Sequence, residues 1–241
     1  MMYTYLPIFS TLVTFVFAAA VLARYHRKGG LHLLLWGLGL VMYGLGTLSE
    51  VWLSFGFDAF MLRLWYLMGA MLTAAWLGEG SIHLLVRKRR VAPALTLILS
   101  LVSLLAAALV FTAPLAANAV SAFDPSQPVS VQYRGMMTRS GLMVFLTVIL
   151  NIYGTLGLVG GALYSAYIFW RKRVLFDRMV GNILIAAGAL MPALAGSFIK
   201  AGLGDWLYLS ELLGAILMYA GFLRATAGRP VPARQSAAAG D

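Results

Sequence analysis

Long apolar runs alternate with short polar segments along the whole chain. Seven of these runs contain about 20 predominantly apolar residues, the length that an α-helix needs to cross the hydrocarbon core of a bilayer. We therefore predict an all-α membrane protein, folded as a bundle of seven transmembrane helices. The predicted helices cover residues 3–23, 31–53, 60–86, 91–113, 141–169, 179–201 and 206–223.

Two segments depart from this pattern. The longest connection, residues 114–139, contains PVSVQY, whose alternation is compatible with a short strand or hairpin over the mouth of the bundle, although a plain surface loop is favoured. The last residues, 225–241, are small, polar and proline-containing, which predicts disorder. We thus expect one transmembrane domain over residues 1–224, followed by a disordered tail over residues 225–241.

The composition agrees with a membrane protein and narrows the chemistry. Of all residues, 61% are hydrophobic and 11% are charged, whereas a soluble domain has about half and about a quarter. Cysteine is absent, which excludes disulfides and thiolate metal sites. His26, His32 and His83 are too scattered for a haem or zinc site, so we expect no metal and no other cofactor.

Positive charge is distributed unevenly between alternate connections. Of the 18 lysines and arginines, only Arg63, Arg134, Arg139 and Lys200 fall on one side of the predicted topology. By the positive-inside rule, the amino terminus is predicted to lie outside and the carboxyl terminus in the cytoplasm. We attribute the net charge of +10 to contact with anionic membrane lipids, and we expect no nucleic-acid partner. The cations of the predicted inner side are Arg24, Arg27, Lys28, Arg87, Lys88, Arg89, Arg90, Arg171, Lys172, Arg173, Arg178, Arg224, Arg229 and Arg234.

A first group of charged residues lies on the outer half of the predicted bundle. Glu50 ends the second helix and Arg63 begins the third, while Lys200 ends the sixth helix and Glu211 lies early in the seventh. Both pairs are joined by short connections, so their members can meet. They form either a polar vestibule for a charged small molecule or two local ion pairs between helix ends, and the second interpretation is favoured.

A second candidate is the pair Glu79 and His83 in the third helix. Their spacing of four places them on one helical face, as a proton relay requires. Glu79 lies about 9 Å from the helix midpoint, and the hydrocarbon half-thickness is about 15 Å, so the carboxyl group is inside the membrane by roughly one turn. The favoured alternative is that Glu79 extends toward the basic residues 87–90 or pairs with a cation of another helix.

Small residues and a proline predict how the helices pack. Glycines in the second and fifth helices and beside Glu79 favour close helix contacts. Pro192 is expected to kink the sixth helix. The glycines concerned are Gly37, Gly39, Gly44, Gly46, Gly78, Gly80, Gly154, Gly157, Gly160 and Gly161.

The predicted layout resembles that of the microbial rhodopsins, with seven helices, an outer amino terminus and a proline in the sixth helix. Rhodopsins hold retinal through a lysine of the seventh helix, and WLYLSELLGAILMYAGFL contains none. Lys200 ends the sixth helix and does not match that position. YGLGTLSE and LRLWYLMGAMLTAAWLGEGSIHLL resemble small uncharacterised bacterial seven-helix proteins and, more distantly, membrane sensor regions of bacterial histidine kinases.

These features lead us to expect a multi-pass protein of the bacterial inner (cytoplasmic) membrane. The favoured function is a non-enzymatic, receptor-like sensor that binds a small or lipid-like ligand and signals through a separate protein partner. The alternative is a small secondary transporter or proton-coupled carrier that uses Glu79 and His83. A membrane enzyme is disfavoured, because no serine–histidine, histidine-rich or paired-aspartate motif is present.

Overall fold

The computed structural model describes residues 2–86, 88, 90–173, 175–200 and 206–227, excluding the side chains of residues 2–4 and 195–200. Within these residues, seven helices are long and apolar enough to cross a membrane, which confirms the predicted bundle. The first two are α1 (Met2–Lys28) and α2 (Leu31–Leu53). The third spans three consecutive elements, and α5 (Val91–Thr112) is the fourth. Those three elements are α3 (Ala59–Leu64), the π-helix η1 (Trp65–Leu72) and α4 (Thr73–Leu85).

The fifth helix is also interrupted by a π-helical segment. It consists of α8 (Gly141–Thr155), η2 (Leu156–Gly160) and α9 (Gly161–Arg171). The last two membrane-length helices are α10 (Phe176–Lys200) and α11 (Trp206–Thr226). Thr226 lies two residues beyond the predicted domain boundary, and the predicted tail otherwise lies almost entirely outside the described residues.

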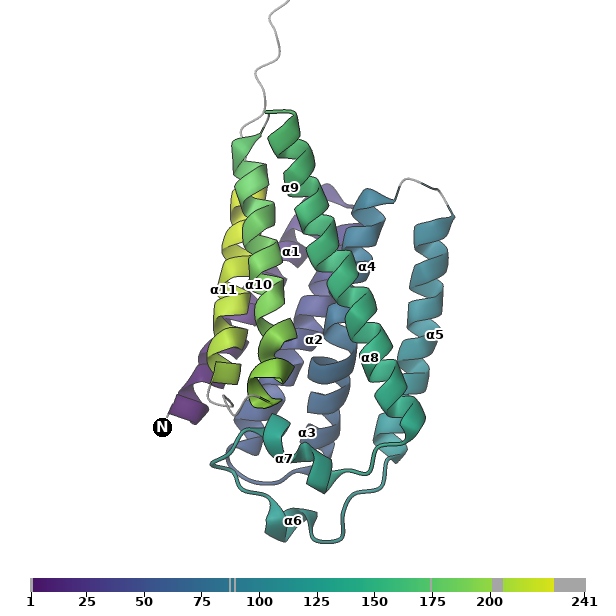
Figure 1. Cartoon of the computed structure of the whole chain (residues 1–241), viewed down its shortest axis with the longest axis vertical. Coiled ribbons are helices and arrows are strands. Elements are labelled where there is room, and N and C mark those ends of the chain that lie inside the picture. Colours follow the sequence, from purple (N-terminus) through teal and green to yellow (C-terminus); the bar gives the residue numbers. More distant parts are fainter. Residues whose placement is uncertain (1, 87, 89, 174, 201–205, 228–241) are drawn as a thin grey trace, which may run out of the picture.

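The helices differ in how deeply they are packed. α2 and α4 lie in the middle of the bundle, where α2 packs against both α1 and α4, and α4 packs against α8. α10 runs along α11 at one edge, and α5 stands at the other (Figure 1). Leu97, Leu101 and Leu104 of α5 are exposed, as expected for a helix that faces lipid on most of its surface.

The two ends of the bundle carry different residues. The described part of the basic clusters lies where α1, α4, α9 and α11 end, which we call the basic end. The opposite end is covered by two short helices, α6 (Ala119–Ala122) and α7 (Val129–Met136), and we call it the capped end (Figure 1). The charge asymmetry of the sequence is therefore an asymmetry between the two ends of the fold.

The strand or hairpin considered for PVSVQY is wrong, because this segment forms helix α7. Val129, Tyr133 and Met136 recur at helical spacing, and Val129 and Met136 are buried under the bundle. Burial of this face outweighs the local alternation. An isolated bridge between Leu115 and Met137 closes the segment into a compact cap rather than a plain loop.

Glycines allow several helices to touch through their backbones, as predicted. A Cβ atom at Gly46 would lie 2.8 Å from the Cα atom of Gly69, and one at Gly78 would lie 2.7 Å from the carbonyl oxygen of Gly154. α2 thus meets η1 directly, and α4 meets α8. Gly160 is an exception, because a Cβ atom there would have no neighbour within 4 Å.

Candidate functional site

A cavity of about 960 Å³ lies inside the bundle. Its walls come from α2, η1, α4, α8, η2, α10 and α11, and α7 covers it at the capped end. Glu50, Glu211 and several aromatic side chains line the part near the capped end, whereas Leu158, Val159 and Met218 line a part closer to the middle of the bundle. The cavity therefore joins a polar region to a larger apolar region.

Both π-helical segments contribute to the cavity wall. Trp65, Tyr66 and Gly69 of η1 line it, as do Leu156 and Leu158 of η2. A π-helix widens the turn and displaces backbone carbonyl groups from their usual partners, and such segments are frequent at functional sites. No pattern in the sequence predicted these two π-helical segments.

Two side chains donate hydrogen bonds to backbone carbonyl oxygens of η1. The Asn151 amide on α8 donates to the carbonyl oxygen of Ala70 at 2.7 Å. The Thr73 hydroxyl donates to the carbonyl oxygen of Met68, five residues earlier, also at 2.7 Å. Asn151 and Thr73 both line the cavity, so the groups that stabilise the π-helix also shape the site.

Glu50 provides the most deeply buried carboxyl group of the cavity wall, with 3% of its surface exposed. Its Oε1 atom accepts a hydrogen bond from the Trp65 indole at 2.8 Å. Its Oε2 atom is buried and receives no hydrogen bond from another described group. Such an atom retains an unused acceptor inside the protein.

Glu211 lines the same cavity as Glu50, and the two carboxyl groups are close enough to interact electrostatically. The Oε2 atom of Glu211 is likewise buried without a donor among the described residues. The backbone near it is fixed by Tyr43, whose hydroxyl donates to the Glu211 carbonyl oxygen at 2.9 Å. The ends of α2 and α11 therefore bring two glutamates that are far apart in the sequence to the same part of the cavity.

The structure does not form the ion pair considered between Glu50 and Arg63. The Arg63 guanidinium instead donates to the carbonyl oxygen of Ala113 at 3.0 Å. Residues 63 and 65 are separated by about 200° around the helix, so Trp65 faces Glu50 while Arg63 points away toward α5. The pairing of Lys200 with Glu211 stays a prediction, because the Lys200 side chain lies outside the described residues.

The short helix α7 covers this polar region with an aromatic residue. The Tyr133 ring packs against Trp65 at 5.3 Å and against Tyr66 at 5.6 Å between ring centroids. Arg134 and Arg139 lie over the same ring, with their guanidinium carbons 5.9 and 5.0 Å from its centre. A ring held between two aromatics and two cations is a firmly placed cover for the cavity.

The connection before α7 is ordered by its own hydrogen bonds. Asp124 Oδ1 accepts from the Ser126 hydroxyl at 2.6 Å and from the Ser126 backbone amide at 2.9 Å. These bonds favour the charged carboxylate and hold the pKa of Asp124 below its usual value of 3.8. Ser130, the second residue of α7, has a buried hydroxyl with no described partner and lines the cavity.

The cavity opens sideways between two helices. Ile152 and Leu156 line it on one side and Leu190 and Leu194 on the other, and all four side chains are exposed. α8 and α10 run apart toward the capped end (Figure 1). Pro192 lies on the cavity wall of α10 within this opening.

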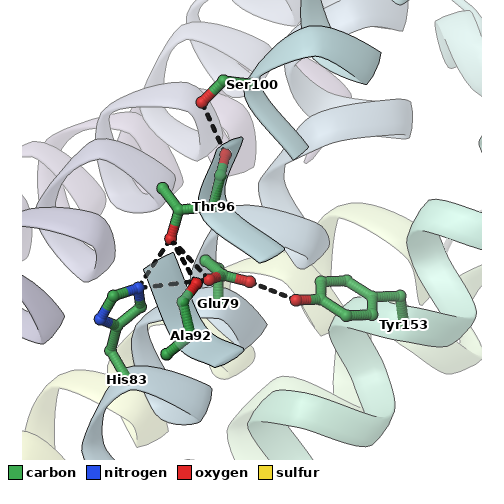
Figure 2. Close-up of polar contacts among 6 residues, drawn as sticks. All are labelled: Glu79, His83, Ala92, Thr96, Ser100 and Tyr153. Carbon is green, nitrogen blue, oxygen red and sulfur yellow. Dashed lines mark hydrogen bonds and ion pairs between the residues drawn. The ribbon is translucent and has the colours of Figure 1, made fainter. Parts of the chain in front are cut away.

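A separate polar cluster surrounds Glu79 (Figure 2). Glu79 is fully buried, and the Thr96 hydroxyl on α5 donates to its Oε1 atom at 2.7 Å. The Tyr153 hydroxyl on α8 donates to its Oε2 atom. His83 Nε2 lies 2.7 Å from the Thr96 hydroxyl and 3.4 Å from Glu79 Oε1. Glu79 and His83 are thus brought together, as their spacing predicted.

The partners of Glu79 differ from the favoured alternative. Among the described residues, no lysine or arginine forms an ion pair with this carboxyl group, and Arg87 and Arg89 lie outside those residues. Hydroxyl groups of two neighbouring helices satisfy it instead. Glu79 also faces away from the cavity, which is lined by Ala74 and Leu77 of the same helix.

Comparison of the chain with protein-family models, with curated proteins and with solved structures found no match. The resemblances to bacterial seven-helix proteins and to rhodopsins therefore stay expectations. The geometry of the cavity is the basis on which a function can be inferred.

Proposed function

We propose that this chain is a non-enzymatic, receptor-like sensor module that binds a small or lipid-like ligand within its helix bundle. The observation that carries the proposal is the cavity of about 960 Å³, which contains buried carboxyl oxygens that receive no hydrogen bond from the described residues. That volume lies in the upper part of the range typical of small-molecule sites, about 300–1,000 Å³. Buried polar atoms without partners favour a site that a ligand completes.

The shape of the cavity supports a lipid-like ligand. Its sideways opening lies between exposed apolar residues of α8, η2 and α10, including Ile152, Leu156 and Leu194. In a bilayer these residues would face hydrocarbon, so an amphiphile could enter from the membrane without passing through water. The capped end would then keep its polar head away from the aqueous phase.

The membrane setting of this proposal follows from the charge distribution. We place the capped end outside and the basic end in the cytoplasm, in a bacterial inner membrane, because cations favour the cytoplasmic side. Membrane lipids would surround the helices, and the basic end offers a surface for a separate signalling protein.

A proton-coupled carrier is the second candidate, and one observation favours it. Tyr153, Glu79, Thr96 and His83 form a continuous chain of hydrogen-bonding groups through α8, α4 and α5 (Figure 2). Such chains can pass protons. These four hydrogen-bonding residues do not line the cavity, which is why we rank the carrier second.

Native mass spectrometry of the purified protein tests the sensor proposal. We expect a co-purifying amphiphile that is lost when the cavity mouth is filled by Ala193→Trp, since Ala193 lines the opening on α10. Ala108→Trp, at an exposed position of α5 away from the cavity, is the matched control and should retain it.

Two outcomes would count against the proposal. A ligand retained equally by both tryptophan variants would place its binding outside the cavity. Proton-dependent uptake into proteoliposomes that Glu79→Gln abolishes, with Glu50→Gln and Glu211→Gln unaffected, would favour the carrier instead.

A further inference from the structure

The polar part of the cavity contains an excess of hydrogen-bond acceptors. Glu50 and Glu211 line the same cavity close enough to interact electrostatically, and each has a buried Oε2 atom that no described group donates to. A carboxylate only accepts hydrogen bonds, and two carboxylates close together repel each other. The pair is satisfied when a proton or a cationic donor lies beside it.

Aromatic rings surround the same carboxyl groups. Trp65, Tyr66 and Tyr43 line the cavity from η1 and α2, and Tyr133 packs on the first two from α7. The Trp65 indole is oriented by its hydrogen bond to Glu50. Aromatic faces combined with carboxylates are the arrangement that recognises ammonium groups, because the negative face of a ring attracts a cation.

The rest of the cavity suits an alkyl chain. Leu158, Val159, Leu190 and Met218 form an apolar wall that continues from the aromatic region toward α10 and α11. A chain placed there would remove apolar surface from contact with water or leave through the sideways opening into lipid.

One cation of the described residues lines the site, and the Lys200 side chain lies outside those residues. Arg134 lines the cavity mouth, but it is exposed to solvent, and its guanidinium group lies over the Tyr133 ring. It forms no ion pair with the buried carboxyl groups among the described residues. No cation of the described residues therefore occupies the acceptors of Glu50 and Glu211.

Building on the proposed function, we infer that the ligand is a cationic amphiphile whose amine or quaternary ammonium head lies beside Glu50 and Glu211, among Trp65, Tyr66 and Tyr133. Its alkyl chain occupies the apolar part of the cavity. Negative charge from the carboxyl pair and the ring faces together select for positive charge in the head group.

Equilibrium binding to the full chain in lipid nanodiscs tests this inference with three probes of equal chain length: decyltrimethylammonium, decanol and decyl sulfate. Empty nanodiscs and the Ala193→Trp variant correct for partitioning into lipid. We expect the ammonium probe to bind at least about tenfold more tightly than decanol, and decyl sulfate to bind most weakly.

The carboxyl pair is then tested by Glu50→Gln combined with Glu211→Gln. Glutamine has nearly the same shape, and its oxygen can still accept from Trp65, so the bundle should persist. We expect the double variant to lose the preference for ammonium, about tenfold or more, and to keep its affinity for decanol. Glu79→Gln removes a buried carboxyl group outside the cavity and should leave the preference unchanged.

The outcomes separate this inference from the proposed function. Equal binding of the ammonium probe and decanol to the wild-type protein would overturn the cationic ligand while leaving an amphiphile site in place. Tighter binding of decyl sulfate than of the ammonium probe would overturn the cationic ligand in favour of recognition of an anion by Arg134. Absence of cavity-dependent binding by any probe would contradict both proposals. The comparison of probes on the wild-type protein decides the point even if the double variant fails to fold.

Discussion

The hydroxyl of Tyr153 on α8 donates to the fully buried carboxyl group of Glu79 on α4. This contact crosses the point where Gly78 and Gly154 bring the two helix backbones together. Glu79 is therefore held by neighbouring helices rather than by water or lipid headgroups. A carboxyl group in this position is stabilised by the donors around it, and its stability depends on each of them.

Tyr153→Phe should destabilise the bundle by about 1–3 kcal/mol, because it leaves a buried Glu79 oxygen without its donor. Thermal unfolding in a mild detergent would measure the effect as a lower melting temperature. Tyr164→Phe is the matched control, since Tyr164 is 57% exposed, and should shift the melting temperature little. Equal melting temperatures for the two variants would show that the hydrogen bond does not stabilise the fold.

Thr96→Val should also cost about 1–3 kcal/mol, because the Thr96 hydroxyl contacts both Glu79 and His83 and valine has nearly the same shape. Thr112→Val provides the comparison. The Thr112 hydroxyl is exposed and bonds to carbonyl groups of its own helix. Guanidinium or heat denaturation would rank the two, and a smaller loss for Thr96→Val than for Thr112→Val would contradict the role of Thr96.

Gly154→Ala should separate α4 from α8 and destabilise the fold by about 1–3 kcal/mol, because the added Cβ atom would collide with the backbone of Ala74. Gly160→Ala, six residues further along the same membrane-spanning helix, adds a Cβ atom with no described neighbour within 4 Å and should be neutral or slightly stabilising. Melting temperatures of the two purified variants check this difference. A neutral Gly154→Ala would mean that the helices are not in backbone contact.

The orientation in the membrane can be tested by single cysteines, because the chain has none of its own. Ser121→Cys lies at an exposed position of α6 at the capped end, and Ala227→Cys lies at an exposed position just after α11. In intact cells, an impermeant thiol reagent should label the first and not the second. Labelling of Ala227→Cys but not of Ser121→Cys would show that the protein has the opposite orientation in the membrane.

Local properties of the sequence were enough to predict the seven helices and the uneven distribution of charge. The length of an apolar run depends only on consecutive residues. The helix predicted over residues 31–53 therefore has the same bounds as α2. The close helix contacts at glycines could also be predicted, because small residues permit close approach whichever helix is the neighbour. The spacing of Glu79 and His83 likewise placed them on one face.

Only the tertiary structure decided which groups these side chains meet. Glu50 accepts a hydrogen bond from Trp65 and shares the cavity with Glu211 rather than pairing with Arg63, because the rotation of each helix about its axis selects the side chain that faces inward. Thr96 could not be assigned to Glu79 from a pattern, since the contact depends on how α4 and α5 pack. The sequence determined which segments enter the membrane, while packing between helices determined the cavity and the partners of its buried acids.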